Sequence, residues 1–288
     1  MWDNDSIEIK CKIDAKILKI NTLLIAAAAL AAGIISSRAQ PVFPQNIVGY
    51  VNVPQTLNID DFALPLDLPA GNAATNVFQN VYNPSLGFGP LGGDLLYLWN
   101  GTTFVEYVFD SLKATGFGTR DDLNSPNPGP GVPGPTLSPG QAVFIDNVNL
   151  PYTNTIVGTV HVDVAATGPQ VVGTTTNIIP LNLQFISSKL PVAGGISSVL
   201  NMTNIYDPAQ GFGPLDGNIV YVPNIAPGGF TGYTEYVFDS LKSTGFGDKT
   251  DYNSPQADGT ALPEPIIPVG GGFFMDNVNA VFTWAQSL

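Results

Sequence analysis

Cysteine and histidine are almost missing from this sequence of 288 residues, which holds one of each. Cys11 lies in the N-terminal stretch, so the chain after residue 39 has no cysteine and forms no disulfide. With no cysteine and one histidine after residue 39, a catalytic Cys–His pair or a His-rich zinc site cannot be assembled within one chain of this mature length. His161 lies in an alternating apolar and polar segment, residues 160–164, where we expect a solvent-facing strand residue.

Basic residues are also scarce. Five Lys or Arg follow residue 39, against nineteen Asp or Glu, and the whole sequence has a net charge of −13. Such a surface repels nucleic acid and anionic lipid, so neither is an expected partner. Cations, neutral glycans and other proteins are the partners that this charge favours.

A long membrane-spanning run is absent as well. The mostly apolar stretch 23–35 is short of the roughly 20 residues that cross a bilayer. It follows a lysine-rich region and precedes the small residues Ser37 and Ala39. This order predicts a secretory signal peptide over residues 1–39, with cleavage after Ala39 and no membrane span afterwards. The chain is therefore expected to be secreted or held at the cell surface; an uncleaved N-terminal anchor is the alternative.

The strongest pattern that is present is an internal repeat. Residues 106–118 read EYVFDSLKATGFG and residues 235–247 read EYVFDSLKSTGFG, so they differ only at Ala114 and Ser243. Three more blocks match in the same order: 47–53 with 156–162, 80–100 with 204–224, and 138–149 with 268–279. Self-similarity of this kind indicates a duplicated structural unit. We predict a first unit over residues 40–155 and a second over 156–288, with a strand at 156–164 shared by both.

Each unit is expected to be built from strands. Glycine and proline are abundant, with 31 and 25 residues, and long amphipathic helical runs are absent. Residues 48–53 and 104–110 alternate, and Asn100-Gly101 indicates a hairpin turn. One short helix is predicted at 73–81, with Asn72 as its N-cap, and its counterpart at 197–205. The fold class is mainly β: two tandem homologous β-sandwich or barrel-like units related by a pseudo-twofold axis.

The strand at 48–53, VGYVNV, and the later segments 139–147 and 269–277 carry a resemblance to a known group. The chain resembles secreted repeat proteins of the verrucomicrobial "VGYVNV" type, which open with such a strand and have a later strand rich in Phe or Ile and ending in Asn. The resemblance covers most of the chain after residue 39. It implies secretion and repetition, and it implies no particular chemistry.

The acidic loops are candidate calcium sites, because calcium prefers oxygen ligands from carboxylates and amides. The expected ligands are Asp122, Asn124, Asp251 and Asn253. Solvated turn residues are the alternative explanation, since Arg120 and Lys249 lie among these donors. No other cofactor is indicated.

Aromatic residues offer a second candidate site. Tyr97, Trp99 and Tyr221 are candidates for stacking on a glycan. Packing in the core is the competing expectation, because alternating strands bury half of their rings, and Pro223 replaces Trp99 in the second unit.

No catalytic constellation is apparent, so the sequence predicts a non-catalytic exported surface or structural protein. Its strand edges would let it assemble with itself into a filament or layer, or join other surface components. An extracellular carbohydrate-binding module that takes polysaccharide is the alternative. A hydrolase using carboxylates alone is a third hypothesis. Glu106 and Asp110 share a strand face but lie roughly 13 Å apart, against the roughly 5–9.5 Å of glycosidase pairs.

Overall fold

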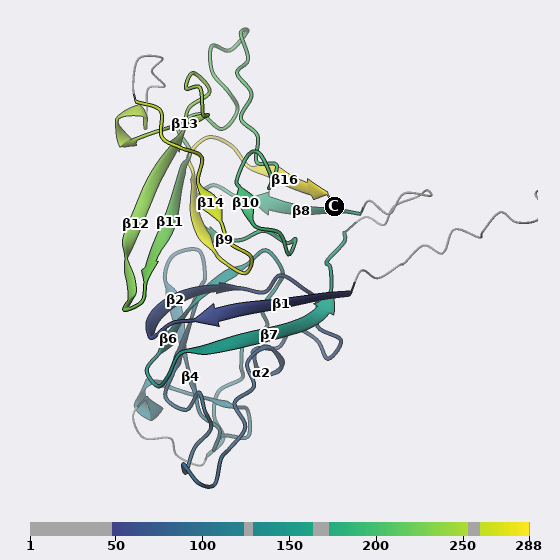
Figure 1. Ribbon diagram of the computed structural model, residues 1–288, viewed down its shortest axis with the longest axis vertical. Coiled ribbons are helices and arrows are strands. Elements are labelled where there is room, and N and C mark those ends of the chain that lie inside the picture. The colour runs from purple at the N-terminus through teal and green to yellow at the C-terminus, as the bar shows by residue number, and fades with distance from the viewer. Residues whose placement is uncertain (1–47, 124–128, 164–172, 253–259, 288) are drawn as a thin grey trace, which may run out of the picture. The chain divides into compact units, whose positions relative to one another are not determined.

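The computed structural model describes residues 48–123, 129–163, 173–252 and 260–287, all within one compact unit, Gln45–Leu288. The expected signal peptide, residues 1–39, lies outside the described residues. Figure 1 shows that nearly all of the regular elements in the described chain are strands, joined by loops. The prediction of a mainly β chain is confirmed.

The first half contains seven strands, one short helix and a 3-10 turn: β1 (Val48–Gln55), β2 (Asn58–Ala63), α2 (Ala74–Val77), β3 (Leu95–Trp99), β4 (Phe104–Phe109), β5 (Phe117–Gly118), η1 (Arg120–Asp122), β6 (Ala142–Asn147) and β7 (Tyr152–Thr159). The second half contains nine strands and a 3-10 turn: β8 (Thr174–Ile179), β9 (Asn182–Ile186), β10 (Gly194–Gly195), β11 (Ile219–Ala226), β12 (Gly229–Phe238), β13 (Phe246–Gly247), η2 (Lys249–Asp251), β14 (Ile266–Ile267), β15 (Phe273–Asn277) and β16 (Phe282–Ser287).

Two five-stranded antiparallel sheets dominate the described chain, and both are open. The first has the strand order β2-β6-β3-β4-β5, and the second has the order β9-β15-β11-β12-β13. The hairpin expected at Asn100-Gly101 joins β3 to β4, with Trp99 paired to Phe104. The matched blocks 106–118 and 235–247 thus occupy the same place in both sheets, on the last two strands of each order.

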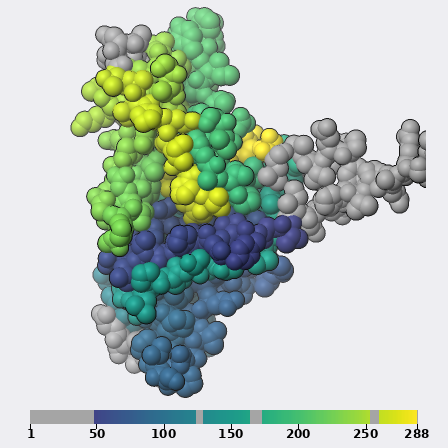
Figure 2. Space-filling model, in the orientation of Figure 1, coloured from purple at the N-terminus to yellow at the C-terminus, as the bar shows by residue number. Residues whose placement is uncertain are grey.

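Each half also has a two-stranded antiparallel ribbon, β1 with β7 and β8 with β16. The register is the same in both: Gln55 pairs with Tyr152, and Ile179 pairs with Phe282 at the corresponding end. Figure 2 shows β1, in purple, lying beside β7, in teal, on the visible face. This ribbon forms one wall of the pocket described below.

The strand expected over residues 156–164 is placed differently. β7 ends at Thr159 and its ladder is with β1, while β8 opens the second half. Asn58 and Asn182, at the starts of β2 and β9, both have left-handed backbone, with φ of 62° and 70°. This shared conformation, which asparagine tolerates better than most residues, marks β8 as the counterpart of β1. The likeness of 47–53 to 156–162 is instead a likeness between two strands that pair with each other.

Both expected helices differ in the structure. α2 has four residues and its N-cap position is Ala73, because the Asn72 side chain instead accepts a hydrogen bond from Leu68 N at 2.9 Å. The chain turns extended at Phe78, with φ −111° and ψ 109°, and this ends the helix. In place of the helix expected at 197–205, residues 197–200 form a turn and residues 201–205 have no regular secondary structure. Among the described residues, no helix has the length and apolar character needed to span a membrane.

Three apolar clusters make up the core, one in each half and a third where the two five-stranded sheets meet. The third is aromatic, with Phe144, Phe185 and Phe274 stacked at centroid distances of 4.3 to 6.1 Å. Reciprocal backbone bonds join the halves nearby. Ala63 N donates to Gly270 O at 2.7 Å, and Ser187 N donates to Gly140 O at 2.9 Å. Each half therefore donates a backbone hydrogen bond to a turn of the other half.

Candidate functional site

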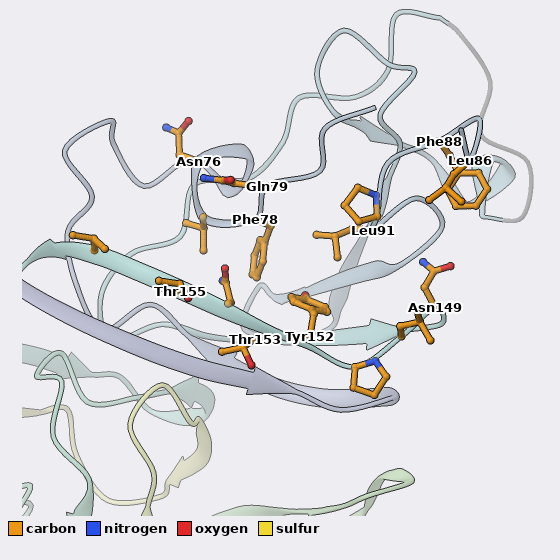
Figure 3. Close-up of a pocket in the computed structure, with 16 residues that line it drawn as sticks. Asn76, Phe78, Gln79, Leu86, Phe88, Leu91, Asn149, Tyr152, Thr153 and Thr155 are labelled. Atoms are coloured by element: carbon orange, nitrogen blue, oxygen red, sulfur yellow. The ribbon is translucent and has the colours of Figure 1, made fainter. Parts of the chain in front are cut away.

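A pocket of about 890 Å³ opens in the first half, between α2 with the loop after it and β7 with the loop before it. In Figure 3, Phe78, Leu91 and Tyr152 lie around the same space, and Thr153 and Thr155 lie along β7. The lining comes from two segments far apart in the sequence, 76–91 and 149–157. Tertiary folding alone brings these segments together.

None of the residues that line the pocket carries a formal charge. The polar ones are amides and hydroxyls, which both donate and accept hydrogen bonds: Asn76, Gln79, Asn149, Tyr152, Thr153, Asn154 and Thr155. The apolar ones include Phe78, Phe88 and Leu91. The pocket therefore offers a neutral hydrogen-bonding wall next to aromatic and aliphatic surface, in a protein that is otherwise acidic.

Asn154 is the most unusual residue of this lining. It stands on the inward face of β7, where strand alternation places core residues, and it is only 8% exposed. Its Nδ2 has no hydrogen-bond partner among the described residues, and neither has the hydroxyl of Tyr152, two residues earlier. A buried polar group left without a partner costs about 1–3 kcal/mol. Both atoms are buried behind the surface of the pocket wall, so they mark an unsatisfied polar region next to the pocket.

Burial and hydrogen bonds set the protonation state and orientation of polar groups in and beside the pocket. Burial raises the pKa of Tyr152, and the charges of Asp94 and Asp60 raise it further, so the phenol stays neutral. Asn149 Nδ2 donates to Asp94 Oδ1 at 2.8 Å. Burial in turn raises the pKa of Asp94 to about 7, against the hydrogen bonds from Val148 N and Asn149 that lower it.

The second half fills the corresponding space with its own side chain. Trp284 occupies the third residue pair of its ribbon, as Asn154 does in the first half. It is 2% exposed, and its Nε1 donates to the carbonyl of Leu200 at 2.7 Å. Leu200 aligns with Asn76, at the same offset of 124 that relates residues 80–100 to 204–224. The first half is open where the indole lies in the second.

The three residues predicted to stack on a glycan lie elsewhere. Tyr97, Trp99 and Tyr221 pack against the aromatic cluster between the sheets. The Trp99 ring lies 5.0 Å from Phe104, and its Nε1 donates to Leu183 O at 3.0 Å. Their rings thus serve packing in this structure, the competing expectation from the sequence.

The sequence predicts four calcium ligands, Asp122, Asn124, Asp251 and Asn253. The two asparagines lie outside the described residues. Asp122 Oδ1 lies 3.1 Å from Lys113 Nζ, and Asp251 Oδ1 lies 3.2 Å from Lys242 Nζ, so a lysine already faces each carboxylate. In the described ranges, no group of three or more His, Cys, Asp or Glu is arranged to hold a metal ion. Calcium binding stays a prediction.

His161 differs from the expected solvent-facing strand residue. It follows the end of β7, and its Nδ1 lies 2.6 Å from Asp67 Oδ2 while its Nε2 lies 3.0 Å from Asp163 Oδ1. The ring therefore bridges two carboxylates. Neither carboxylate is a lining residue of the pocket.

The carboxylates on β4 are also engaged. Arg120 Nη1 lies 2.5 and 2.6 Å from the two oxygens of Glu106, and Asp110 is fully buried just after the strand. Asp110 Oδ1 accepts a hydrogen bond from Leu112 N at 2.9 Å.

The fold and the pocket together define a mainly β protein with open antiparallel sheets and an uncharged pocket in its first half. A scan of protein-family models, a search of curated proteins and a search of solved structures each found no match. The resemblance to secreted "VGYVNV" proteins stays a prediction.

Tyr152 belongs to the aromatic residues that the sequence offers for stacking on a sugar, but sequence reasoning missed Asn154 and Asn76 as site residues. One signal was available: an asparagine at an inward strand position, aligned with a tryptophan in the other half. To see this difference, one must align β7 with β16. The match between 138–149 and 268–279 gives that alignment when it is extended by five residues, to Asn154 and Trp284.

Proposed function

We propose that this chain is a non-catalytic exported binding protein that takes a neutral polyhydroxylated ligand, a carbohydrate, in the pocket between α2 and β7. The observation that carries this proposal is the uncharged lining of the pocket, in which amide and hydroxyl side chains lie beside aromatic and aliphatic ones. A sugar hydroxyl donates and accepts hydrogen bonds, so it pairs with amides and hydroxyls alike.

The rest of the lining supports the same ligand class. A sugar ring has an apolar C–H face, and Phe78, Phe88 and Leu91 offer apolar surface for it. Neutral amides and hydroxyls fix orientation without a charge, as small-molecule sites commonly do. The acidic balance of the chain disfavours an anionic ligand. Export is supported by the basic, apolar and small-residue order of residues 10–39.

The test is a titration of the purified chain with neutral oligosaccharides, followed by calorimetry and ligand-observed NMR. Asn154→Trp copies the second half and fills the pocket, so we expect it to abolish binding while the fold is kept. Ile178→Ser, on the exposed face of β8, is the matched control and should bind as the parent does. Equal binding by parent and Asn154→Trp, or no binding of any neutral glycan, would contradict the proposal.

Self-assembly is the second candidate function, and one observation favours it. The outward face of the β1–β7 ribbon carries Val48, Tyr50 and Val157, which are 71%, 65% and 51% exposed. Tyr50 and Val157 are paired across the ribbon and form a continuous apolar strip. Apolar strips of this kind mark association sites.

Sedimentation velocity over a range of concentrations tests this candidate. Val48→Ser with Tyr50→Ser should shift the chain toward monomer, whereas Val148→Ser, at an exposed position outside the ribbon, should not. A parent chain that remains monomeric at every concentration removes the candidate.

A further inference from the structure

Lys242, Asp239 and Asp251 form a buried charged group in the second half, away from the pocket. Lys242 Nζ lies 3.2 Å from Asp251 Oδ1 and 3.8 Å from Asp239 Oδ2, and the three side chains are at most 1% exposed. Asp239 and Lys242 lie in the turn between β12 and β13, and Asp251 ends η2. Holding two carboxylates and one ammonium inside a protein carries a desolvation cost of several kcal/mol per ion.

The contact between Lys242 and Asp251 differs from a hydrogen-bonded ion pair. Neither oxygen of Asp251 has a hydrogen-bond partner among the described residues, so Nζ approaches Oδ1 outside hydrogen-bonding geometry. The carbon that the amine would attack, Cγ, is bonded directly to this Oδ1, so Nζ lies within one bond length of the 3.2 Å separation from it. Holding two reactants next to each other in this way acts like a very high local concentration of each. The amine therefore stands where it can react with the carboxyl group.

Space for this carboxylate is built into the backbone. A Cβ on Gly247 would collide with the Asp251 carboxylate, and a Cβ on Gly118 would collide with that of Asp122 in the first half. Both glycines close the block that is nearly identical in the two halves, 106–118 and 235–247. The block also contains the lysine of each half and the aspartate three residues before it.

We propose that Lys242 and Asp251 condense to an amide crosslink, with Asp239 moving the protons. The ammonium first gives a proton to the Asp239 carboxylate, and the neutral Nζ then attacks Cγ of Asp251. An N–C bond forms between Nζ and Cγ. The departing carboxylate oxygen then takes one proton from Asp239 and a second proton from the nitrogen, and its C–O bond breaks. One water leaves, the amide keeps one N–H, and Asp239 ends as it began.

Two physical effects favour the reaction at this site. The amide is neutral, so its formation removes both charges of the pair and their desolvation cost. In water, an amide between two separate molecules tends to hydrolyse to the free acid and amine. Holding the two groups next to each other in the fold opposes this tendency. The crosslink closes the turn from β12 through β13 to η2, in a chain whose described residues contain no cysteine to form a disulfide.

The first half serves as an internal comparison. Lys113 and Asp122 are about one-tenth exposed, and Asp122 Oδ2 accepts a hydrogen bond from Thr119 N at 2.9 Å. Burial opposes ionisation of Asp122, but the bonds from Lys113 and Thr119 outweigh it and hold its pKa below the usual value. This carboxylate is stabilised as an anion, and we expect the pair to stay ionic.

Intact mass measurement of the purified full chain tests the proposal. The parent should be lighter than its sequence mass by one water, and Lys242→Arg should show no such loss. Asp239→Asn keeps both reacting groups and should lose the water slowly or not at all. Since Asp251→Asn offers an amide to the same amine, it should lose ammonia in place of water.

Trypsin mapping locates the bond. Cleavage occurs after Lys189 and Lys249, but a crosslinked Lys242 resists it, so residues 190–249 should remain joined to 250–288. This linked pair of peptides supports the proposal. A parent of full sequence mass, or a water loss that maps to any other residues, overturns it, and neither result bears on ligand binding in the pocket.

Discussion

Asn154 and Trp284 hold the same position in two ribbons of identical register, yet only the tryptophan is satisfied by a hydrogen bond, to Leu200 O. The indole seals the second half with its own ring. In the first half, the amide leaves a cavity and an unpaired donor. The difference between Asn154 and Trp284 therefore accompanies an open first half and a filled second half, although β7 and β16 also differ at other positions.

Removing the indole should open the second half. Trp284→Ala is expected to lower the free energy of unfolding by about 3–5 kcal/mol, because it deletes a buried ring and leaves a cavity. Trp284→Phe retains most of the volume but leaves the Leu200 carbonyl without its donor, so about 1–3 kcal/mol is expected. Urea denaturation followed by circular dichroism measures both. A smaller loss for Ala than for Phe would contradict the packing described.

Replacing Asp94 by asparagine should change how stability depends on pH. The folded chain keeps the Asp94 proton up to about pH 7 because of burial, whereas an unfolded chain releases it near pH 4. The folded state therefore binds more protons between these values, and stability falls as pH rises from about 4 to 7. Asp94→Asn should remove this fall and be more stable than the parent by up to about 4 kcal/mol at pH 8, with little difference at pH 4.

The second half supplies the matched control for that experiment. Asn218 aligns with Asp94, and its Oδ1 accepts from Val278 N at 2.9 Å, as Asp94 Oδ1 accepts from Val148 N at 3.0 Å. Asn218→Asp should introduce the pH-dependent loss that Asp94→Asn removes. Burial also raises the pKa of Asp61 to about 7, so Asp61 adds a similar pH dependence of stability to the parent and to each variant. The difference between the stability curves of variant and parent therefore reports on Asp94 alone. Parallel curves for parent and Asp94→Asn would refute this account.

Adding a methyl group at Gly247 should destabilise the turn region of the second half. The new Cβ would overlap the Asp251 carboxylate, and overpacking of a tight site costs about 1–3 kcal/mol. Gly228→Ala is the control, because nothing lies within 4 Å of a Cβ at that position. Thermal unfolding of both variants gives the comparison. Similar melting temperatures for the two would show that the carboxylate has room to move.

The sequence predicts the strands better than the helices. Alternation in 48–53 and 104–110 and the Asn100-Gly101 turn give β1, β4 and the β3–β4 hairpin, because side-chain period and turn chemistry are local properties. The helix at 73–81 is shorter in the structure, since the Asn72 side chain bonds to Leu68 N rather than to the helix start. That choice depends on the preceding loop, which local propensity does not register.

The site was beyond reach from the sequence for a different reason. Residues 76–91 and 149–157 meet only in the folded chain, and the polar groups of Asn154 and Tyr152 are informative only because they are buried. Tyr97, Trp99 and Tyr221 were predicted to stack on a glycan because they are aromatic, but their rings pack against the aromatic cluster between the sheets. Residue type alone does not tell an exposed ring from a packed one.

Two backbone hydrogen bonds join the halves reciprocally: Ala63 of the first half donates to Gly270 of the second, and Ser187 of the second donates to Gly140 of the first. A chain cut between Asp163 and Gly173 would leave each fragment with a donor and an acceptor facing empty space. Two identical fragments complement each other in just this way, so we expect a single half to be found as a homodimer.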